Sequence, residues 1–239
     1  MSLKHRPVKA NSRANWRAAC GSWSHPLTQQ SDLEKEARRF ARELIGLLNN
    51  TVTTGIRLST HIDRHGNAVI DYRDPSSSEL GAVIPMRIGR KSARFGLRVQ
   101  HTLTLEDGTG YLRNSKSVHA LTMADGNPIL TYDFVRDPPN KYPEAHLHIE
   151  RDAATLQDLL NTAGKPSRPS ERLHLPVGGR RFRPSLEDLI EFCILEELVD
   201  CHDGWEAVLR EARDRFYAFQ LKAAVRQHPQ AAREALQSL

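Results

Sequence analysis

The sequence lacks the features that mark several common classes of protein. Its only cysteines are Cys20, Cys193 and Cys201, an odd number without CxxC spacing, which argues against a disulfide framework and a zinc finger. No apolar run reaches the length of a membrane span, and the N-terminal stretch has no apolar core of a signal peptide. We therefore expect reduced thiols, a cytoplasmic location and no membrane partner.

Motifs of the well-known catalytic classes are also missing. The sequence has no GxSxG nucleophile elbow, and its Gly-Gly pair is not followed by the Lys-Ser/Thr ending of a phosphate-binding P-loop. No internal repeat of solenoid period is visible. These absences leave it open whether the protein is an enzyme.

The composition is that of a globular chain with a charged arm. At 239 residues, 39% hydrophobic and 26% charged, the chain is long enough to bury a core. The net charge of +5 is matched by the five cations that precede the first acid, namely Lys4, Arg6, Lys9, Arg13 and Arg17. Residues 1–30 form a basic N-terminal arm, which either contacts phosphates or acidic surfaces or is simply solvated.

Residues 31–163 are predicted to form a domain of one helix and an antiparallel sheet. "SDLE" offers a capping box at Ser31 and Glu34, and an apolar stripe then continues at helical spacing to about Asn49. From there the apolar period drops to two. The expected strand segments are 55–63, 68–73, 93–106, 111–121, 129–136 and 145–150. Short turns between them indicate a curled antiparallel β-meander packed against the helix.

The C-terminal third is predicted to be helical. A helix is expected over 152–163, and the Pro/Ser/Lys-rich segment 164–172 reads as a linker or exposed loop. Residues 173–239 begin with a short strand and continue with a helix capped by Ser185 and Asp188 and an amphipathic helix from Trp205. The fold class is therefore α+β, with this C-terminal region packed on the sheet domain.

The stretch "KYPEAHLHIERD" is the first candidate site. In an extended strand His146, His148 and Glu150 point to one side, while Leu147 and Ile149 point to the other, into the core. Imidazole is the side chain best suited to proton transfer near neutral pH. The three residues are therefore our candidate catalytic groups.

Two alternatives to catalysis stay open for this strand. The histidines could be the polar side of a half-buried sheet, with no function of their own. They could also bind a metal ion if the fold brings Glu150 or His174 close enough to complete the site. We expect no metal and no cofactor. His101, by contrast, shares a strand face with apolar residues and is expected to be a hydrogen-bonded core histidine.

The stretch "LHLPVGGRRFRP" is the second candidate site. Its Gly-Gly pair allows a tight turn, and three arginines stand just before the helix that begins after Ser185. Guanidinium groups and a helix N-terminus together favour an anion. The candidate phosphate-binding residues are His174, Arg180, Arg181 and Arg183. In the structural alternative the arginines pair with Glu187 or Asp188, and Phe182 fills the core.

The order of these features resembles one known family. The runs "ILTYDFVRDPPNKYPEAHLHIE" and "RPSLEDLIEFCI" resemble TumE-type bacterial toxin proteins over about residues 90–195, and that resemblance implies a ribonuclease. The chain departs from that pattern in its Pro-containing loop, which has fewer histidines, its longer C-terminal helices and its basic arm. It also resembles actinobacterial proteins without an assigned role.

Two functional hypotheses from different classes follow. In the first, the protein engages a phosphate-bearing ligand or RNA and acts as a toxin-like, metal-independent ribonuclease. In the second, it is a non-catalytic interaction module whose C-terminal amphipathic helices bind a protein partner or a second copy of the chain.

Overall fold

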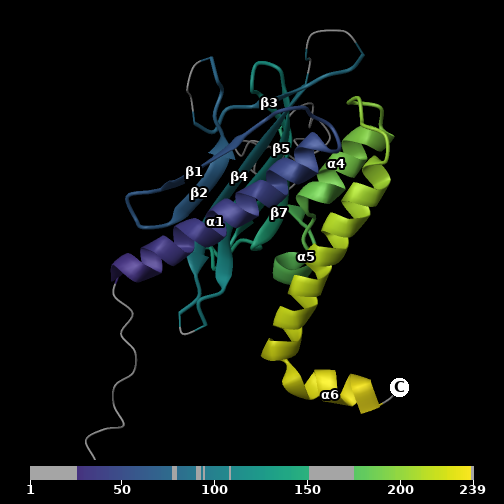
Figure 1. Ribbon diagram of the computed structural model, residues 1–239. Coiled ribbons are helices and arrows are strands. Elements are labelled where there is room, and N and C mark those ends of the chain that lie inside the picture. Colours follow the sequence, from purple (N-terminus) through teal and green to yellow (C-terminus); the bar gives the residue numbers. More distant parts are fainter. Residues whose placement is uncertain are drawn as a thin grey trace, which may run out of the picture.

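The computed structural model describes residues 26–76, 80–89, 93, 95–107, 109–150 and 175–237. It confirms the expected α+β class: an antiparallel sheet, an N-terminal helix packed on it, and C-terminal helices (Figure 1). Most of the basic arm, the expected helix at 152–163, the segment 164–172 and His174 lie outside the described residues. Within the described ranges, no helix combines the length and the apolar character that crossing a membrane requires.

Helix α1 (Pro26–Asn49) lies across the sheet and buries the apolar stripe expected from the sequence. Leu33, Ala37, Leu44 and Leu48 are all buried, and each buried leucine contributes about 2 kcal/mol to folding. The expected start at Ser31 is wrong, because the helix already begins at Pro26. Proline suits the first turn of a helix, where its fixed φ is favourable and its missing N–H is not needed.

Among the described residues the sheet has eight strands, of which seven form one continuous meander. Their bounds are β1 (Leu58–Ile62), β2 (Ala68–Tyr72), β3 (Ile84–Met86), β4 (Phe95–Leu105), β5 (Leu112–Met123), β6 (Pro128–Val135), β7 (Ala145–Ile149) and β8 (Leu175–Pro176). The order is β1-β2-β4-β5-β6-β7-β8, and β3 pairs with β4 outside this path. All pairs are antiparallel. Strand β3 was not predicted, since three residues are too few to show a period of two.

One face of the sheet, here called the helix face, packs against α1. The register places Ile70 opposite His101, His101 opposite Ser117, and Ser117 opposite Phe134, so these side chains share that face. Ile70 and Phe134 are fully buried there, and the Phe40 ring of α1 meets the His101 ring edge-on at 5.1 Å. The helix face therefore holds the main core.

The opposite face, here called the far face, carries the alternate residues. Asp71 lies opposite Gln100, Gln100 opposite Val118, Val118 opposite Asp133, and Asp133 opposite His146. This row runs across β2, β4, β5, β6 and β7. It places His146 on the side of the sheet away from α1, as the period of two predicts.

The C-terminal region comprises α3 (Gly179–Phe182), α4 (Leu186–Leu195), α5 (Trp205–Gln227) and α6 (Pro229–Gln237). The capping box of Ser185 and Asp188 at the start of α4 is confirmed, with both reciprocal contacts present. Helix α4 contributes to the main core, whereas α5 buries only Leu209 and Ala212 among its described residues. The short α3 was not predicted, because a single turn leaves no helical period to detect.

The turn before α3 depends on Gly178. This residue has φ of 64°, and a Cβ atom there would stand 2.0 Å from the carbonyl oxygen of Phe182. Its neighbour Gly179 has φ of 71°, but a Cβ atom there would meet nothing within 4 Å. Comparing substitutions at the two glycines therefore separates the effect of backbone strain from that of steric collision.

We expect Gly178→Ala to lower the free energy of unfolding clearly more than Gly179→Ala. Both substitutions place a side chain at positive φ, at a cost of about 1–3 kcal/mol, but only the first also forces the α3 backbone away. Urea unfolding of both variants and the parent measures the difference. Equal losses in the two variants would show that the contact with Phe182 does not matter.

Candidate functional site

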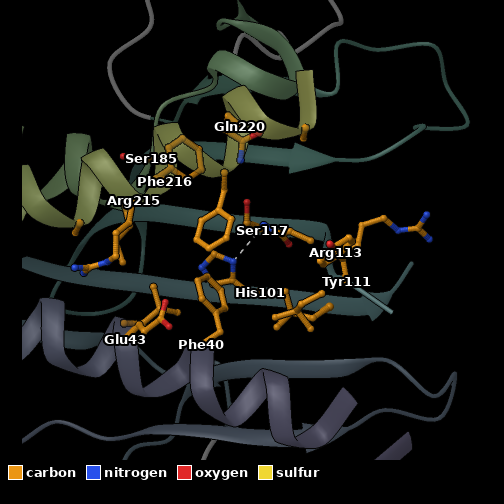
Figure 2. A pocket seen from close by; sticks show the side chains of 18 of the residues that line it. Phe40, Glu43, His101, Tyr111, Arg113, Ser117, Ser185, Arg215, Phe216 and Gln220 are labelled. Atoms are coloured by element: carbon orange, nitrogen blue, oxygen red, sulfur yellow. Dashed lines mark hydrogen bonds between the residues drawn. The ribbon is translucent and has the colours of Figure 1, made fainter. Parts of the chain in front are cut away.

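A cavity of about 600 Å³ opens on the helix face and is lined by residues of the sheet, α1 and α5 (Figure 2). His101 and Ser117 come from the sheet, Phe40 from α1, and Phe216 and Gln220 from α5. The volume falls within the range of small-molecule binding sites. The cavity is therefore the first place to look for a ligand.

The cavity lining is predominantly basic. Its cationic residues are Arg39, Arg113, Arg181, Arg183, Arg215, Lys222 and Arg226, and its carboxylates are Glu36, Glu43, Glu106 and Glu187. Arg39 pairs with Glu36 at 2.7 Å, and Arg215 pairs with Glu211 at 2.5 Å. Within the described part of the chain, Arg113, Arg181, Arg183 and Arg226 have no carboxylate oxygen within 4.0 Å. The cavity wall therefore carries positive charge that no carboxylate of the described residues pairs with directly.

Arg183 is the most deeply placed of these arginines. Its Cζ atom lies 4.1 Å from the centroid of the Phe134 ring and 5.6 Å from that of Phe216, and its Nη1 donates to the carbonyl oxygen of Arg180 at 2.5 Å. Burial, with smaller contributions from Arg136 and Arg181, lowers its pKa to about 10. The guanidinium still carries its charge at neutral pH, stacked between two aromatic rings.

His101 and His119 form a buried pair at the base of the cavity. Their Nε2 atoms lie 3.2 Å apart, and Nδ1 of His101 lies 3.3 Å from the Asn114 amide. The Asn114 amide is best oriented with its NH₂ donating to the carbonyls of Lys116 at 2.6 Å and Thr102 at 3.2 Å. The amide oxygen then accepts from His101 Nδ1–H, and His101 Nε2 accepts from His119. This order of donors and acceptors is satisfied with both imidazoles neutral.

The environment of the pair favours that neutral state. Burial, with a smaller contribution from the nearby Arg183 charge, lowers the pKa of His119 to about 3. Burial also lowers the pKa of His101 well below its ordinary value, with His119 and Arg183 adding to the effect. The expectation that His101 is a hydrogen-bonded core histidine agrees with its contacts and with its 4% exposure.

The far face holds the first predicted cluster. His146 and His148 lie side by side on β7, with ring centroids 4.9 Å apart. Leu147 and Ile149, expected in the core, are only half-buried, whereas His146 is 5% exposed. His146 is therefore more buried than Leu147 and Ile149, whereas His148 is half-buried like them.

The third member of this cluster is Asp133, which the sequence did not indicate. Asp133 of β6 lies opposite His146, and ligand atoms of Asp133, His146 and His148 all lie within 4.8 Å of one another. Glu150 follows the end of β7, where its backbone N–H donates to the carbonyl of Ile129 at 2.9 Å. Only the pairing register of β6 and β7 could have identified Asp133.

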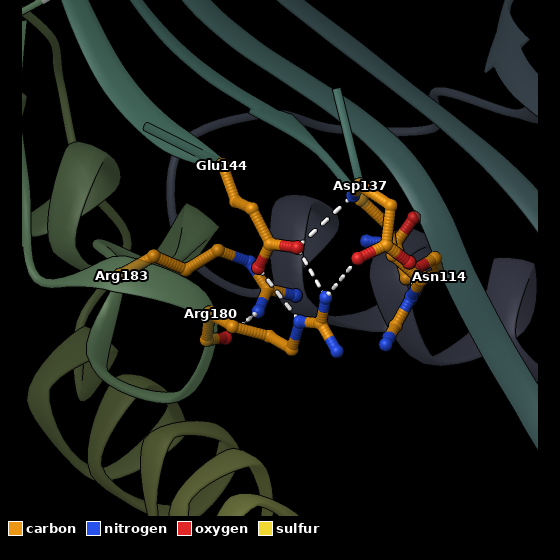
Figure 3. A network of polar contacts seen from close by, with 6 residues as sticks. Asn114, Asp137, Glu144, Arg180 and Arg183 are labelled. Atoms are coloured by element: carbon orange, nitrogen blue, oxygen red, sulfur yellow. Dashed lines mark hydrogen bonds and ion pairs between the residues drawn. The ribbon is translucent and has the colours of Figure 1, made fainter. Parts of the chain in front are cut away.

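Arg180, one of the predicted phosphate-binding arginines, is engaged by two carboxylates (Figure 3). Its Nε donates to Glu144 at 2.6 Å, and its Nη2 donates to both Glu144 and, at 2.7 Å, Asp137. These bonds lower the pKa of Glu144 to about 2 and raise that of Arg180. Arg180 therefore joins α3 to the residue just before β7.

The partners of Arg180 differ from those in the structural alternative. That alternative named Glu187 and Asp188 as carboxylates, but Asp188 pairs instead with Arg213 at 3.1 Å. Phe182, expected there to fill the core, is 67% exposed. The turn is held by its salt bridges and by Arg183 rather than by a buried phenylalanine.

The two candidate clusters do not lie on the same face. Arg181 and Arg183 line the cavity on the helix face, whereas His146 and His148 belong to the far face. The sheet itself therefore separates these arginines from the histidine pair. The sequence analysis did not identify the aromatic residues from α1 and α5 that line the cavity. Finding them would have required knowing how those helices cross the sheet.

The neutral histidine pair makes a pH-dependent prediction. Between the ordinary histidine value of 6.5 and the folded value of about 3 for His119, the unfolded chain binds a proton that the folded chain does not. The contribution of the neutral histidine pair to the free energy of unfolding is therefore complete above pH 6.5. It falls as the pH is lowered, by up to about 1.4 kcal/mol per pH unit for each histidine that stays neutral in the folded chain.

We expect His119→Gln to flatten this dependence between pH 6.5 and 4, because the amide can still donate to His101 but does not titrate. Urea unfolding at several pH values measures the slope. His65→Gln, at an exposed turn, serves as the control. An unchanged slope in His119→Gln would contradict the neutral pair.

The resemblance to TumE-type toxin proteins stays a prediction that rests on the sequence runs that suggested it. The cavity, its arginines and the far-face cluster are therefore interpreted from their own geometry and charge. Comparison with family models, curated proteins and solved structures gives no match to this chain.

Proposed function

We propose that the protein binds a phosphate-bearing ligand with an aromatic part, such as a nucleotide, in the cavity between α1 and α5. The observation that carries the proposal is the set of arginines that face this cavity without a neutralising carboxylate among the described residues. Guanidinium groups bind phosphate oxygens through paired, charge-assisted hydrogen bonds. In a partly buried cavity these bonds are less screened than at an open surface.

Aromatic residues in the same lining support the second part of the proposal. Phe40, Tyr111, Phe216 and Phe219 all contribute to the cavity, and a planar base gains about 1–3 kcal/mol from stacking on such a ring. The neutral His101 and His119 pair adds polar atoms at the base without adding charge. A nucleotide matches both the charged and the aromatic parts of the lining.

Arg181 has a further property that suits an anion. Its Nε–H is buried and has no acceptor among the described residues, and its bond to Gln220 is long at 3.4 Å. A phosphate oxygen would satisfy these donors after a small rotation of the side chain. Cleavage of RNA by His146 and His148 has less support, because the sheet separates them from Arg181 and Arg183.

We expect ATP to bind the purified chain more tightly than adenosine, since only ATP carries phosphates. Arg181→Gln and Arg113→Gln should each weaken ATP binding about 10- to 100-fold, the equivalent of one charge-assisted contact, and added salt should weaken it further. Calorimetric titration measures the affinities. A short single-stranded RNA, titrated in parallel, tests the RNA form of the proposal.

Arg38→Gln is the matched control, because Arg38 is exposed on α1, pairs with Glu34 and does not line the cavity. It should leave the ATP affinity unchanged. The proposal is wrong if neither ATP nor RNA binds saturably, or if the control variant loses as much affinity as the cavity variants.

A second candidate function is self-association through α5, which a specific observation favours. Tyr217, Leu221 and Val225 recur every four residues along one side of this helix and are 41%, 56% and 51% exposed. Phe216 and Gln220, on another side, line the cavity. The helix thus keeps an uncovered apolar stripe, which two copies could bury together.

We expect sedimentation velocity to show a dimer that Leu221→Glu converts to a monomer, because a charge in a buried apolar contact is costly. Leu195→Glu, at an equally apolar but separate exposed position at the end of α4, should leave the dimer intact. A parent chain that stays monomeric at every concentration tested would rule out this second function.

A further inference from the structure

The far-face cluster of Asp133, His146 and His148 has the composition and spacing of a metal site. Two imidazoles from alternate positions of β7 meet a carboxylate from the directly opposed position of β6. One ligand atom from each residue lies within 4.8 Å of the other two. Neighbouring strands of a regular sheet hold such a triplet without any special loop.

The tautomer of His146 is set by its neighbour. Nδ1 of His146 lies 2.8 Å from the carbonyl oxygen of Pro143, and a carbonyl can only accept, so Nδ1 carries the proton. Nε2 of the neutral ring then carries the lone pair and lies 3.8 Å from Oδ2 of Asp133. A backbone carbonyl that fixes the ring in this way is the usual support of a metal-binding histidine.

The carboxylate of Asp133 is poorly satisfied by the described residues. Its Oδ1 is buried and accepts no hydrogen bond from the described residues. Its Oδ2 contact with His146, at 3.8 Å, is longer than a hydrogen bond. A buried carboxylate oxygen without a donor costs free energy, and a cation at this point would remove that cost.

We propose that Asp133, His146 and His148 bind a divalent transition metal, with zinc as the best match. Two nitrogen ligands and one carboxylate oxygen suit zinc better than magnesium or calcium, which prefer oxygen alone. Three protein ligands leave one position open for water or another small ligand. The sequence analysis left metal binding open with Glu150 or His174 as the third ligand, whereas the cluster places Asp133 there.

The spacing requires only a small adjustment of the side chains. A tetrahedral zinc ion with bonds of about 2.0–2.2 Å keeps its ligand atoms about 3.4 Å apart. The His146 and Asp133 atoms already lie 3.8 Å apart. The distances between ligand atoms of the three residues, which reach up to 4.8 Å, shorten by rotation about side-chain bonds, with the two strands left in place.

An ion pair with a ring contact is the simpler explanation of the same cluster. It accounts for the contact of His146 with Asp133 and for the edge-on packing of His148 on His146. It gives no partner to Oδ1 of Asp133 and no reason for three ligand atoms to converge. The two explanations differ in whether zinc binds in a one-to-one ratio at this cluster.

The test is a titration of the full chain, first stripped with a chelator and dialysed, with zinc chloride in a calorimeter. We expect one zinc ion per chain, and at least about tenfold weaker binding in Asp133→Asn and in His148→Ala. Asp133→Asn keeps the size of the side chain and so guards against a variant that merely fails to fold. Cobalt in place of zinc should give the intense visible bands of a four-coordinate ion, lost in the same variants.

His65→Ala removes an exposed imidazole from the turn between β1 and β2 and should leave zinc affinity unchanged. The metal site is refuted if no one-to-one binding is seen, or if His65→Ala weakens it as much as His148→Ala. Binding retained in a folded Asp133→Asn variant refutes the role of Asp133. Because ATP is not used, these results are independent of the cavity on the helix face.

Discussion

The antiparallel hydrogen-bond ladder from β1 to β8 is the constraint on which both candidate sites depend. Side chains alternate between the two faces with a period of two, so the register alone puts His101 and His119 under the helices and Asp133 and His146 on the far face. A shift of one residue between β6 and β7 would exchange the faces of every β7 residue. The apolar packing of α1 on one face holds this register in place.

Much of the fold could be predicted from local patterns, whereas the sites could not. The period of two predicted the long strands, and the Ser185 and Asp188 cap predicted the start of α4. The contact of Arg180 with Glu144, by contrast, joins residues 36 positions apart, and the approach of Asp133 to His146 depends on strand pairing. Neither residue type nor spacing along one segment contains that information, because each contact joins two segments.

The helix face combines an arginine that stays charged with two histidines that stay neutral. Arg183 keeps its proton because even a pKa of about 10 lies well above neutral pH, while His101 and His119 lose theirs because burial and the same guanidinium oppose a second cation. The cavity therefore offers a fixed positive charge beside a neutral hydrogen-bonding pair. Such a division favours an anion whose uncharged part reaches the base of the cavity.

Strand β8 has a consequence for how the protein behaves in concentrated solution. It is the last strand of the path and spans only Leu175–Pro176, and proline has no N–H to offer to another chain. An edge this short, ending in proline, is a poor template for strand addition by a neighbouring molecule. At this edge, the described strand therefore disfavours the edge-to-edge aggregation that threatens open sheets.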